Sequence, residues 1–125
     1  MSMIGGMLPF ADTIPYKATG SNSTALQRGF IRALLCGQDP VGYISLCNAI
    51  ATATVPEYKV LSGGSPVLII AGDEDQSTPL SGCKHIQSEI GENCRLEVLQ
   101  GVGHWHCIEA PEDVGKLVEE FVSSI

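Results

Sequence analysis

Basic residues are scarce in this sequence. Lys and Arg total 7 against 14 Asp and Glu in 125 residues, which gives a formal net charge of -7 at pH 7. No stretch gathers Lys or Arg into a stripe or cluster. Proteins that hold a phosphate backbone do so mainly through such clusters. The composition therefore argues against a nucleic-acid partner.

Long apolar runs are also missing. No segment approaches the roughly 18 consecutive apolar residues that a membrane-spanning helix needs. Residues 1–10 have neither a basic start nor a long apolar stretch, so they do not look like a leader. We therefore expect a soluble, cytoplasmic protein with no membrane segment and no targeting signal.

Paired cysteines are absent as well. The five cysteines are odd in number, widely spaced and free of C-x-x-C units: Cys36, Cys47, Cys83, Cys94 and Cys107. This usage is typical of free thiols in a reducing compartment. Cys107 stands close to His104, as a nucleophile beside a base would, but its apolar neighbour Ile108 favours a buried thiol.

The sequence does contain enough apolar material for a core. It is 44% hydrophobic and 17% charged, which lies in the ordinary globular range and away from disordered compositions. The length fits one domain. A chain of this size buries about two-thirds of its unfolded surface without a disulfide or metal.

The first part of the chain has a helical pattern. Residues 1–22 are interrupted by Gly and Pro, so any helix there is short. A capping box and a terminal glycine predict a helix over 24–37, and an Asp-Pro pair starts a second helix over 39–54. The short link between them predicts an antiparallel hairpin. The first helix has an apolar face that we expect to pack in the core, with a pocket wall as the alternative: Leu26, Phe30, Ile31, Leu34 and Leu35.

Residues 61–125 differ in pattern from residues 1–60, and we place a boundary between them. The predicted elements are a strand over 66–71, a helix over 79–90, a strand over 94–100 and an amphipathic helix over 111–125. The unbroken apolar run of the first strand is typical of a strand buried on both faces of a parallel sheet. The predicted fold class is α/β, with a short parallel sheet of about two strands, flanking helices and an N-terminal helical region.

The loops that follow the two predicted strands carry the candidate chemistry. Residues 72–79 contain the acidic cluster Asp73–Asp75, and residues 101–106 contain two histidines. Parallel strands lie about 4.8 Å apart and end at the same edge, so a carboxylate of one loop can reach an imidazole of the other. A carboxylate that accepts one ring N–H leaves the other ring nitrogen free as a general base.

Other interpretations of these loops stay open. Acidic residues after a buried strand are often helix caps or solvated charges, and composition alone favours this interpretation of Asp73–Asp75. His104 and His106 could be ordinary loop residues. The cluster also offers metal-ligand types, but no H-E-x-x-H or Cys/His spacing supports a metal; these residues are Asp73, Asp75, His104 and His106. We expect no metal and no cofactor.

The whole pattern is more specific than its parts. An apolar strand followed by Gly-x-x-Asp-x-x-x-Pro, then about thirty residues later Gly-His-Trp with Glu109 and Pro111 after it, closely resembles the C-terminal half of the α/β-hydrolase family. The resemblance implies that Asp75 is the acid of a catalytic triad and that His104 is its base. It also implies esterase or lactonase chemistry on a small-molecule ester or lactone.

The helical region resembles the cap of the same family. The run 35–50, with Gly-Gln-Asp-Pro-Val-Gly-Tyr inside it, is similar to the branch that contains the 3-oxoadipate enol-lactonases. The resemblance implies a cap over residues 1–60 that supplies an apolar wall for the substrate, and a C-terminal core over residues 61–125. Trp105, Tyr43 and Phe30 are the candidate substrate-binding residues, although packing explains them equally well.

The family's nucleophile is not found among these 125 residues. It lies on a G-x-S-x-G elbow, and no serine, cysteine or aspartate here has glycine at both minus two and plus two. The oxyanion-hole segment is absent too. We therefore expect a truncated hydrolase half that is inactive alone, and that self-associates or joins a complementary half to cover its sheet. The alternatives are a non-catalytic small-molecule binding or interaction module, and catalysis by His104 as a base with no covalent intermediate.

Overall fold

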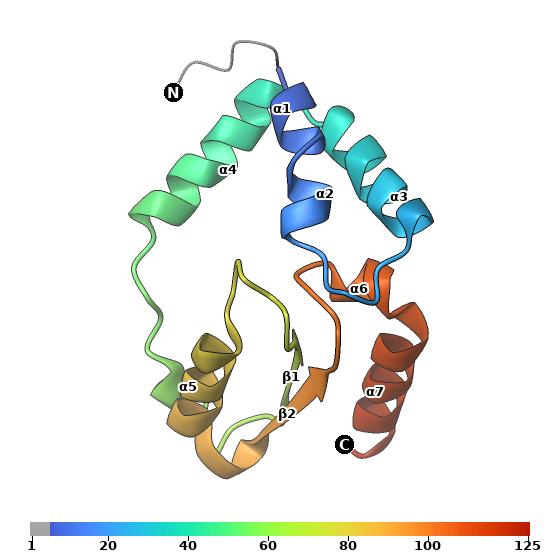
Figure 1. Cartoon of the computed structure of the whole chain (residues 1–125). Coiled ribbons are helices and arrows are strands. Elements are labelled where there is room, and N and C mark those ends of the chain that lie inside the picture. The colour runs from blue at the N-terminus through green and yellow to red at the C-terminus, as the bar shows by residue number, and fades with distance from the viewer. Residues whose placement is uncertain (1–5) are drawn as a thin grey trace.

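Helices form the first part of the chain. The computed structural model describes residues 6–125, so residues 1–5 of the predicted cap lie outside the described residues. The helices are α1 (Leu8–Ala11), α2 (Ile14–Lys17), α3 (Ala25–Cys36) and α4 (Pro40–Thr52), as Figure 1 shows. The short α1 and α2 and the longer α3 and α4 agree with the sequence predictions.

The two longer helices begin at the predicted caps. Thr24 Oγ1 accepts a hydrogen bond from Gln27 N at 3.2 Å, and Gln27 Oε1 accepts one from Thr24 N at 2.8 Å, which completes a capping box. Asp39 caps α4 by accepting hydrogen bonds from the backbone N–H groups of Val41 and Gly42. Local hydrogen bonding therefore explains where both helices start.

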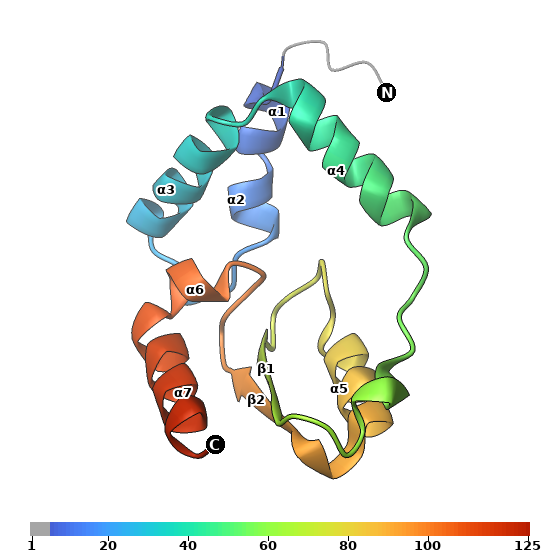
Figure 2. The ribbon, with the colours of Figure 1, turned by 180° about the vertical axis from the view of Figure 1, so that it is seen from behind.

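The predicted antiparallel hairpin of α3 and α4 is wrong. The two helices slope away from each other from a common end beside α1, and Figures 1 and 2 show this from opposite sides. α3 packs against α1 and α2 instead, whereas α4 buries none of its residues. The apolar residues of α4 are spread around the helix, so no single face favours pairing with α3.

Only part of the apolar face of α3 is buried. Ile31 and Leu35 form a core with Met7 and Ala11 near α1. The exposed members of the face are Leu26, Phe30 and Leu34. Their predicted core packing is wrong, because α1 and α2 cover only one strip of the helix. Partly buried side chains from both parts of the chain pack around this core: Phe10, Ile14, Tyr43, Trp105 and Ile108.

A strand-helix-strand unit forms the second part of the chain. Its elements are η1 (Tyr58–Leu61), β1 (Val67–Gly72), α5 (Leu80–Ile90), η2 (Gly91–Asn93), β2 (Cys94–Leu99), α6 (His106–Glu109) and α7 (Pro111–Ser123). β1 and β2 pair in parallel, with Val67 opposite Cys94 and Gly72 opposite Leu99. The predicted strands and the two long helices are confirmed. The turns η1 and η2 and the helix α6 were not predicted, because segments of three or four residues are too short to show a periodicity.

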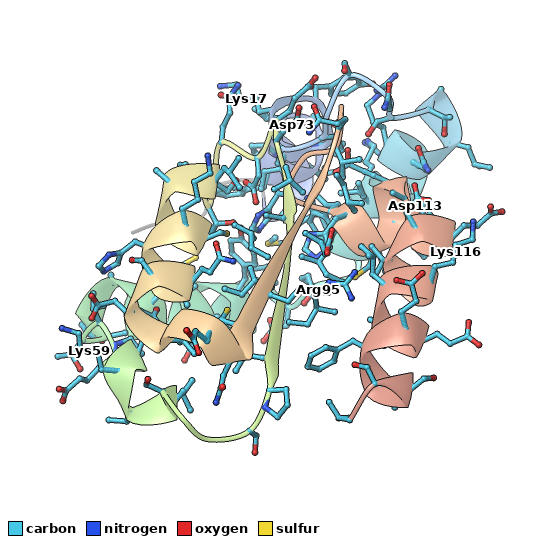
Figure 3. All side chains as sticks on the ribbon, turned by 90° about the horizontal axis from the view of Figure 1, so that it is seen from below. Lys17, Lys59, Asp73, Arg95, Asp113 and Lys116 are labelled. Carbon is cyan, nitrogen blue, oxygen red and sulfur yellow. The ribbon has the colours of Figure 1, made fainter. Side chains whose placement is uncertain are left out.

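The two-stranded sheet is partly open. α5 and α7 lie on opposite sides of the strands, as Figure 3 shows from below. Residues 67–70 of β1 are half-buried, and burial is complete only at Ala71 and Gly72. The predicted burial on both faces therefore holds only at the carboxyl end of the strand. Among residues 6–125, no helix combines the length and hydropathy that crossing a bilayer requires.

Candidate functional site

Three segments meet beyond the carboxyl edge of the sheet because glycines let their backbones touch. They are residues 18–23, 72–79 and 101–106. A Cβ on Gly72 would overlap Val102 O, and one on Gly103 would lie 2.6 Å from Ala18 O. Only glycine allows so close an approach. The two predicted loops are therefore brought together, and the segment 18–23 after α2, which the sequence did not point to, lies against them (Figure 1).

Asp75 is held in place by its own loop. Its Oδ1 accepts hydrogen bonds from the N–H groups of Ser77 at 2.8 Å and Thr78 at 2.9 Å, and its Oδ2 accepts one from Thr78 Oγ1 at 2.6 Å. Burial raises the pKa of Asp75, but hydrogen bonds from Thr78, His104 and Ser77 outweigh burial and lower this pKa from 3.8 to about 2. Asp75 is therefore a carboxylate at neutral pH.

His104 faces this carboxylate from the other loop. Its Nδ1 lies 2.9 Å from Asp75 Oδ2 and 3.3 Å from Thr78 Oγ1, and its backbone N donates to Ala18 O at 2.8 Å. Because an ionised carboxylate can only accept, we assign the ring proton to Nδ1, which leaves Nε2 as an acceptor. The His104 side chain is 41% exposed and that of Asp75 only 7%. The pair thus combines an accessible imidazole with a shielded carboxylate.

A cavity of about 440 Å³ lies beside the imidazole. It is lined by His104 together with Tyr43 and Trp105, two of the predicted substrate-binding residues. A second cavity of about 320 Å³ shares Tyr43 and Trp105 and extends to Leu46 of α4. Phe30, the third predicted substrate-binding residue, is exposed on α3 and lines neither cavity. The other lining residues are Ile14, Lys17, Ala18, Leu35, Gln76 and Ser77 in the first cavity, and Leu34, Leu35 and Gln38 in the second.

The other two acids of the Asp73–Asp75 cluster tie the loops to each other. Asp73 Oδ1 accepts a hydrogen bond from Gly101 N at 2.7 Å. Glu74 accepts hydrogen bonds from both N and Oγ of Ser21, each at 2.6 Å. These carboxylates are neither helix caps nor unpaired solvated charges. They bridge the segments that place Asp75 and His104.

Two residues at the site were missed by sequence reasoning. Thr78 supports Asp75, and its spacing from that aspartate is one at which a side chain commonly bonds to a nearby backbone N–H group. Glu109 is buried and accepts hydrogen bonds from the backbone N–H groups of Gly103 and Trp105, on either side of His104. Sequence reasoning placed Glu109 in the motif that follows His104, as an acid between two apolar residues, but gave it no role at the site.

His106 and Cys107 do not join the pair. The described part of the chain offers the buried His106 Nδ1 no hydrogen-bond partner. Cys107 is exposed, so the predicted buried thiol is wrong, because α6 presents this position to solvent. All five cysteines are free thiols. Residues 6–125 contain no group of three or more His, Cys, Asp or Glu that could hold a metal ion.

Comparisons with known proteins identify the family of this chain. A family model described as TAP-like protein matches residues 33–124. The chain is 33% identical over 116 residues to 3-oxoadipate enol-lactonase 1 of Acinetobacter baylyi. It is 35% identical over 60 residues to the human monoacylglycerol lipase ABHD6, and 34% identical over 61 residues to monoacylglycerol lipase abhd6-A of Xenopus laevis. The parallel sheet of β1 and β2 with its flanking helices is part of an α/β-hydrolase fold. The chain belongs to the α/β-hydrolase family, within which it matches the TAP-like proteins.

The chain spans less than half the length of these relatives. The match covers 93% of this chain and 40% of the enol-lactonase. The match to human ABHD6 covers 48% of this chain and 18% of that protein, and the match to the Xenopus laevis protein covers 49% of this chain and 18% of that protein. The similarity to the enol-lactonase therefore includes most of the helical first part as well as the sheet.

Proposed function

We propose that this chain supplies the acid and the base of a carboxylic-ester or lactone hydrolase, with Asp75 as the acid and His104 as the base. The observation that carries the proposal is the 2.9 Å contact between Asp75 Oδ2 and His104 Nδ1. It joins a buried carboxylate to an accessible imidazole at the edge where parallel sheets place their sites. The relatives named as an enol-lactonase and a monoacylglycerol lipase support this reaction class.

In this proposal His104 acts through Nε2. While Asp75 holds Nδ1–H, Nε2 takes the proton of an attacking hydroxyl as the hydroxyl oxygen bonds to the ester carbonyl carbon. The Asp75 carboxylate stabilises the imidazolium that forms. Nε2 then returns the proton to the leaving alkoxide as the ester C–O bond breaks. A second cycle, with water as the attacking group, releases the acid and restores the neutral imidazole.

We place the attacking hydroxyl outside these 125 residues. No serine in the chain has glycine at both flanking positions of an elbow, and the chain spans 40% of the enol-lactonase that it matches. Without a nucleophile and oxyanion donors, both the covalent step and the charge stabilisation are lost, each worth orders of magnitude in rate. We therefore expect the chain to be inactive in isolation.

The substrate we favour is a small ester or lactone with an apolar portion. Tyr43 and Trp105 line both cavities. The apolar portion of a substrate whose ester group lies at His104 can therefore extend from the first cavity into the second, toward Leu46. Lys17 also lines the first cavity and can supply a cation there. In this proposal residues 1–60 act as the cap over the site and residues 61–125 as the core.

The exposed apolar surface supports an assembled state. On α7, Val118, Val122 and the following Ile125 are exposed, and on α4 so are Val41 and Ile50. Val118 and Val122 lie one helical turn apart, and exposed apolar surface larger than scattered single residues marks interaction sites in soluble domains. We propose that the chain covers these faces by self-association or by binding a complementary hydrolase half.

A reducing location fits the cysteines. Five free thiols, three of them exposed, would be prone to oxidation in an oxidising compartment. We propose a cytoplasmic location on this basis. Fractionation of the native protein, with the redox state of Cys36, Cys47 and Cys107 recorded, tests it.

A second candidate function is a non-catalytic binding or interaction module. The observation that favours it is the pair of apolar cavities in a chain without an elbow serine. Such a module would bind small apolar esters and release them unchanged. Ligand binding without turnover, in every assembled state of the chain, is the result that it predicts.

Hydrolysis of a short-chain aryl ester by the purified chain tests the proposal. The assay compares the wild type with His104→Ala and Asp75→Asn, alone and after addition of a separately produced N-terminal hydrolase half that carries an elbow serine. We expect turnover only in the mixture, and loss of that turnover in both variants. Turnover by the chain alone that His104→Ala abolishes would instead support base catalysis without a covalent intermediate. Equal turnover by the wild type and both variants in the mixture contradicts the proposed roles.

A further inference from the structure

We propose that Glu109 is a positioning residue for His104. Its side chain is buried, and no Lys or Arg is paired with it among the described residues. A buried carboxylate without a cation is costly unless hydrogen bonds compensate it. Because Glu109 is buried beside the candidate base, its carboxylate needs several hydrogen-bond donors, and the structure supplies them.

The donors come from both sides of His104. Glu109 Oε2 accepts from Gly103 N at 3.0 Å, and Glu109 Oε1 accepts from Trp105 N at 3.0 Å. The two backbone N–H groups belong to the residues directly before and after the base. One carboxylate therefore fixes the peptide on both sides of His104, which sets the direction in which the imidazole leaves the loop.

The same carboxylate anchors the segment that lies against the loop. Oε2 also accepts from Gly20 N and from Ser23 Oγ, both at 2.7 Å. His104 N in turn donates to Ala18 O at 2.8 Å. The segment 18–23 and the loop 101–106 are thus joined through Glu109. A substitution at Glu109 should therefore disturb the 2.9 Å contact between Asp75 and His104. It would act through the backbone of the loop, because Glu109 bonds to neither of these two side chains.

Glu109→Gln tests this role with little change in size. Three donors converge on Oε2 and one on Oε1, so the amide oxygen of Gln is best placed toward the three. Its NH₂ then faces Trp105 N–H, which sets a donor against a donor. The variant therefore selectively breaks the link that follows His104. Ser23→Ala is the matched control, because it removes one donor to the same carboxylate and leaves the links to residues 103 and 105.

The measurement is proton exchange with water at His104 Nδ1, read by NMR on the full 125-residue chain with ¹⁵N-labelled histidine. His85, on α5, is the internal reference in the same spectra. We expect Glu109→Gln to accelerate the exchange about tenfold or more, the effect of losing one charge-assisted hydrogen bond. Ser23→Ala should leave it near the wild-type rate even where it lowers stability. A folded Glu109→Gln protein with wild-type exchange, or equal acceleration in both variants, overturns the inference.

A measurement on the unmodified chain covers the case in which Glu109→Gln does not fold. Amide hydrogen exchange at Gly103 and Trp105 should be slow, because both N–H groups are held by a buried carboxylate. Exchange there at the rate of an unstructured loop overturns the inference. The inference rests on the proposed role of His104, yet the two fail separately. If His104→Ala leaves ester hydrolysis unchanged, the proposed function is contradicted. If Glu109→Gln leaves proton exchange at His104 Nδ1 unchanged, the positioning role is contradicted.

Discussion

Ser21 and Glu74 are 53 residues apart in the sequence and are joined by two hydrogen bonds of 2.6 Å each. Ser21 follows α2 and Glu74 follows β1, so this contact joins the helical first part of the chain to the loop that carries Asp75. Its place beside the close backbone contacts of Gly72 and Gly103 shows that the site is built where segments distant in sequence meet.

The close approach at Gly72 leads to the first prediction. Gly72→Ala places a Cβ where Val102 O and Gly103 O lie. Since both neighbours are backbone, the loop has to shift, and we expect the free energy of unfolding to fall by about 3 kcal/mol. Gly82→Ala is the control, because its Cβ meets nothing within 4 Å in α5, and it should raise stability by up to about 1 kcal/mol. Urea unfolding of the two variants should therefore give changes of opposite sign, and equal effects contradict the prediction.

The second prediction concerns stability in acid. Asp75 has a pKa of about 2 in the folded chain, below its ordinary value of 3.8. A lowered folded-state pKa means that the stabilisation is present above about pH 4 and is lost as the pH falls through 2. The difference corresponds to about 2 kcal/mol. Urea midpoints measured between pH 2 and 5 should fall toward acid in the wild type and less steeply in Asp75→Asn. The same slope in both proteins would show that Asp75 does not cause the change.

Thr78 provides a third prediction, on the cause of that lowered pKa. Its Oγ1 donates to Asp75 Oδ2 at 2.6 Å. Thr78→Val removes this donor while keeping the shape, so the pKa of Asp75 should rise toward its ordinary value. Thr78→Ser keeps the hydroxyl and should leave the pKa low. Carboxyl ¹³C titration of Asp75 by NMR distinguishes the two, and an unchanged pKa in Thr78→Val contradicts the prediction.

Sequence patterns predicted the sheet better than the packing of the helices. The apolar run 66–71 and the Gly72 that ends it carry a local signal, and β1 and β2 form in parallel as expected. The partners of α3 could not be predicted in this way. They are the short helices α1 and α2, which have too few residues to show a periodicity. α3 packs against those helices, whereas α4 buries none of its residues.

The candidate site could be predicted only in part, because some of it depends on tertiary packing. Asp75 and His104 were predicted to meet because both follow strands of one parallel sheet, and the structure brings them together. Glu109 acts on backbone N–H groups, which no sequence pattern displays. Phe30 shares a helical face with Leu34, yet of the two only Leu34 lines one of the two cavities beside Trp105. Which part of that face is covered depends on tertiary packing.

The fourth prediction concerns the two cavities. Trp105 is the single tryptophan of the chain and lines both of them, so a bound apolar ester should shift its fluorescence. Leu46→Asp places a charge in the wall of the second cavity and should weaken binding of a medium-chain ester about tenfold, the effect of losing one buried apolar contact. Val41→Asp changes the same helix at an exposed position that lines neither cavity, and its titration should match the wild type. Equal weakening in both variants contradicts binding in these cavities.

The exposed face of α7 leads to the fifth prediction, on assembly. Val118 and Val122 are 45% and 61% exposed, and they lie one turn apart, so they form one stripe on the helix. Water contact with this stripe is unfavourable, and pairing it with a second copy removes it from solvent. Sedimentation of the purified chain at tens of micromolar should therefore give a mass above the 13.2 kDa of one copy.

Two lysine substitutions on α7 distinguish the effect of a charge within this stripe from the effect of an added charge elsewhere on the helix. Val122→Lys places a charge within the stripe and should weaken association at least about tenfold, because burying an unpaired ammonium costs more than burying a methyl-bearing side chain gains. Ser123→Lys adds the same charge at the next, exposed position, which points about 100° away around the helix. It should sediment like the wild type. A stably folded wild-type monomer contradicts self-association, and equal loss of association in both variants places the interface elsewhere than on this stripe.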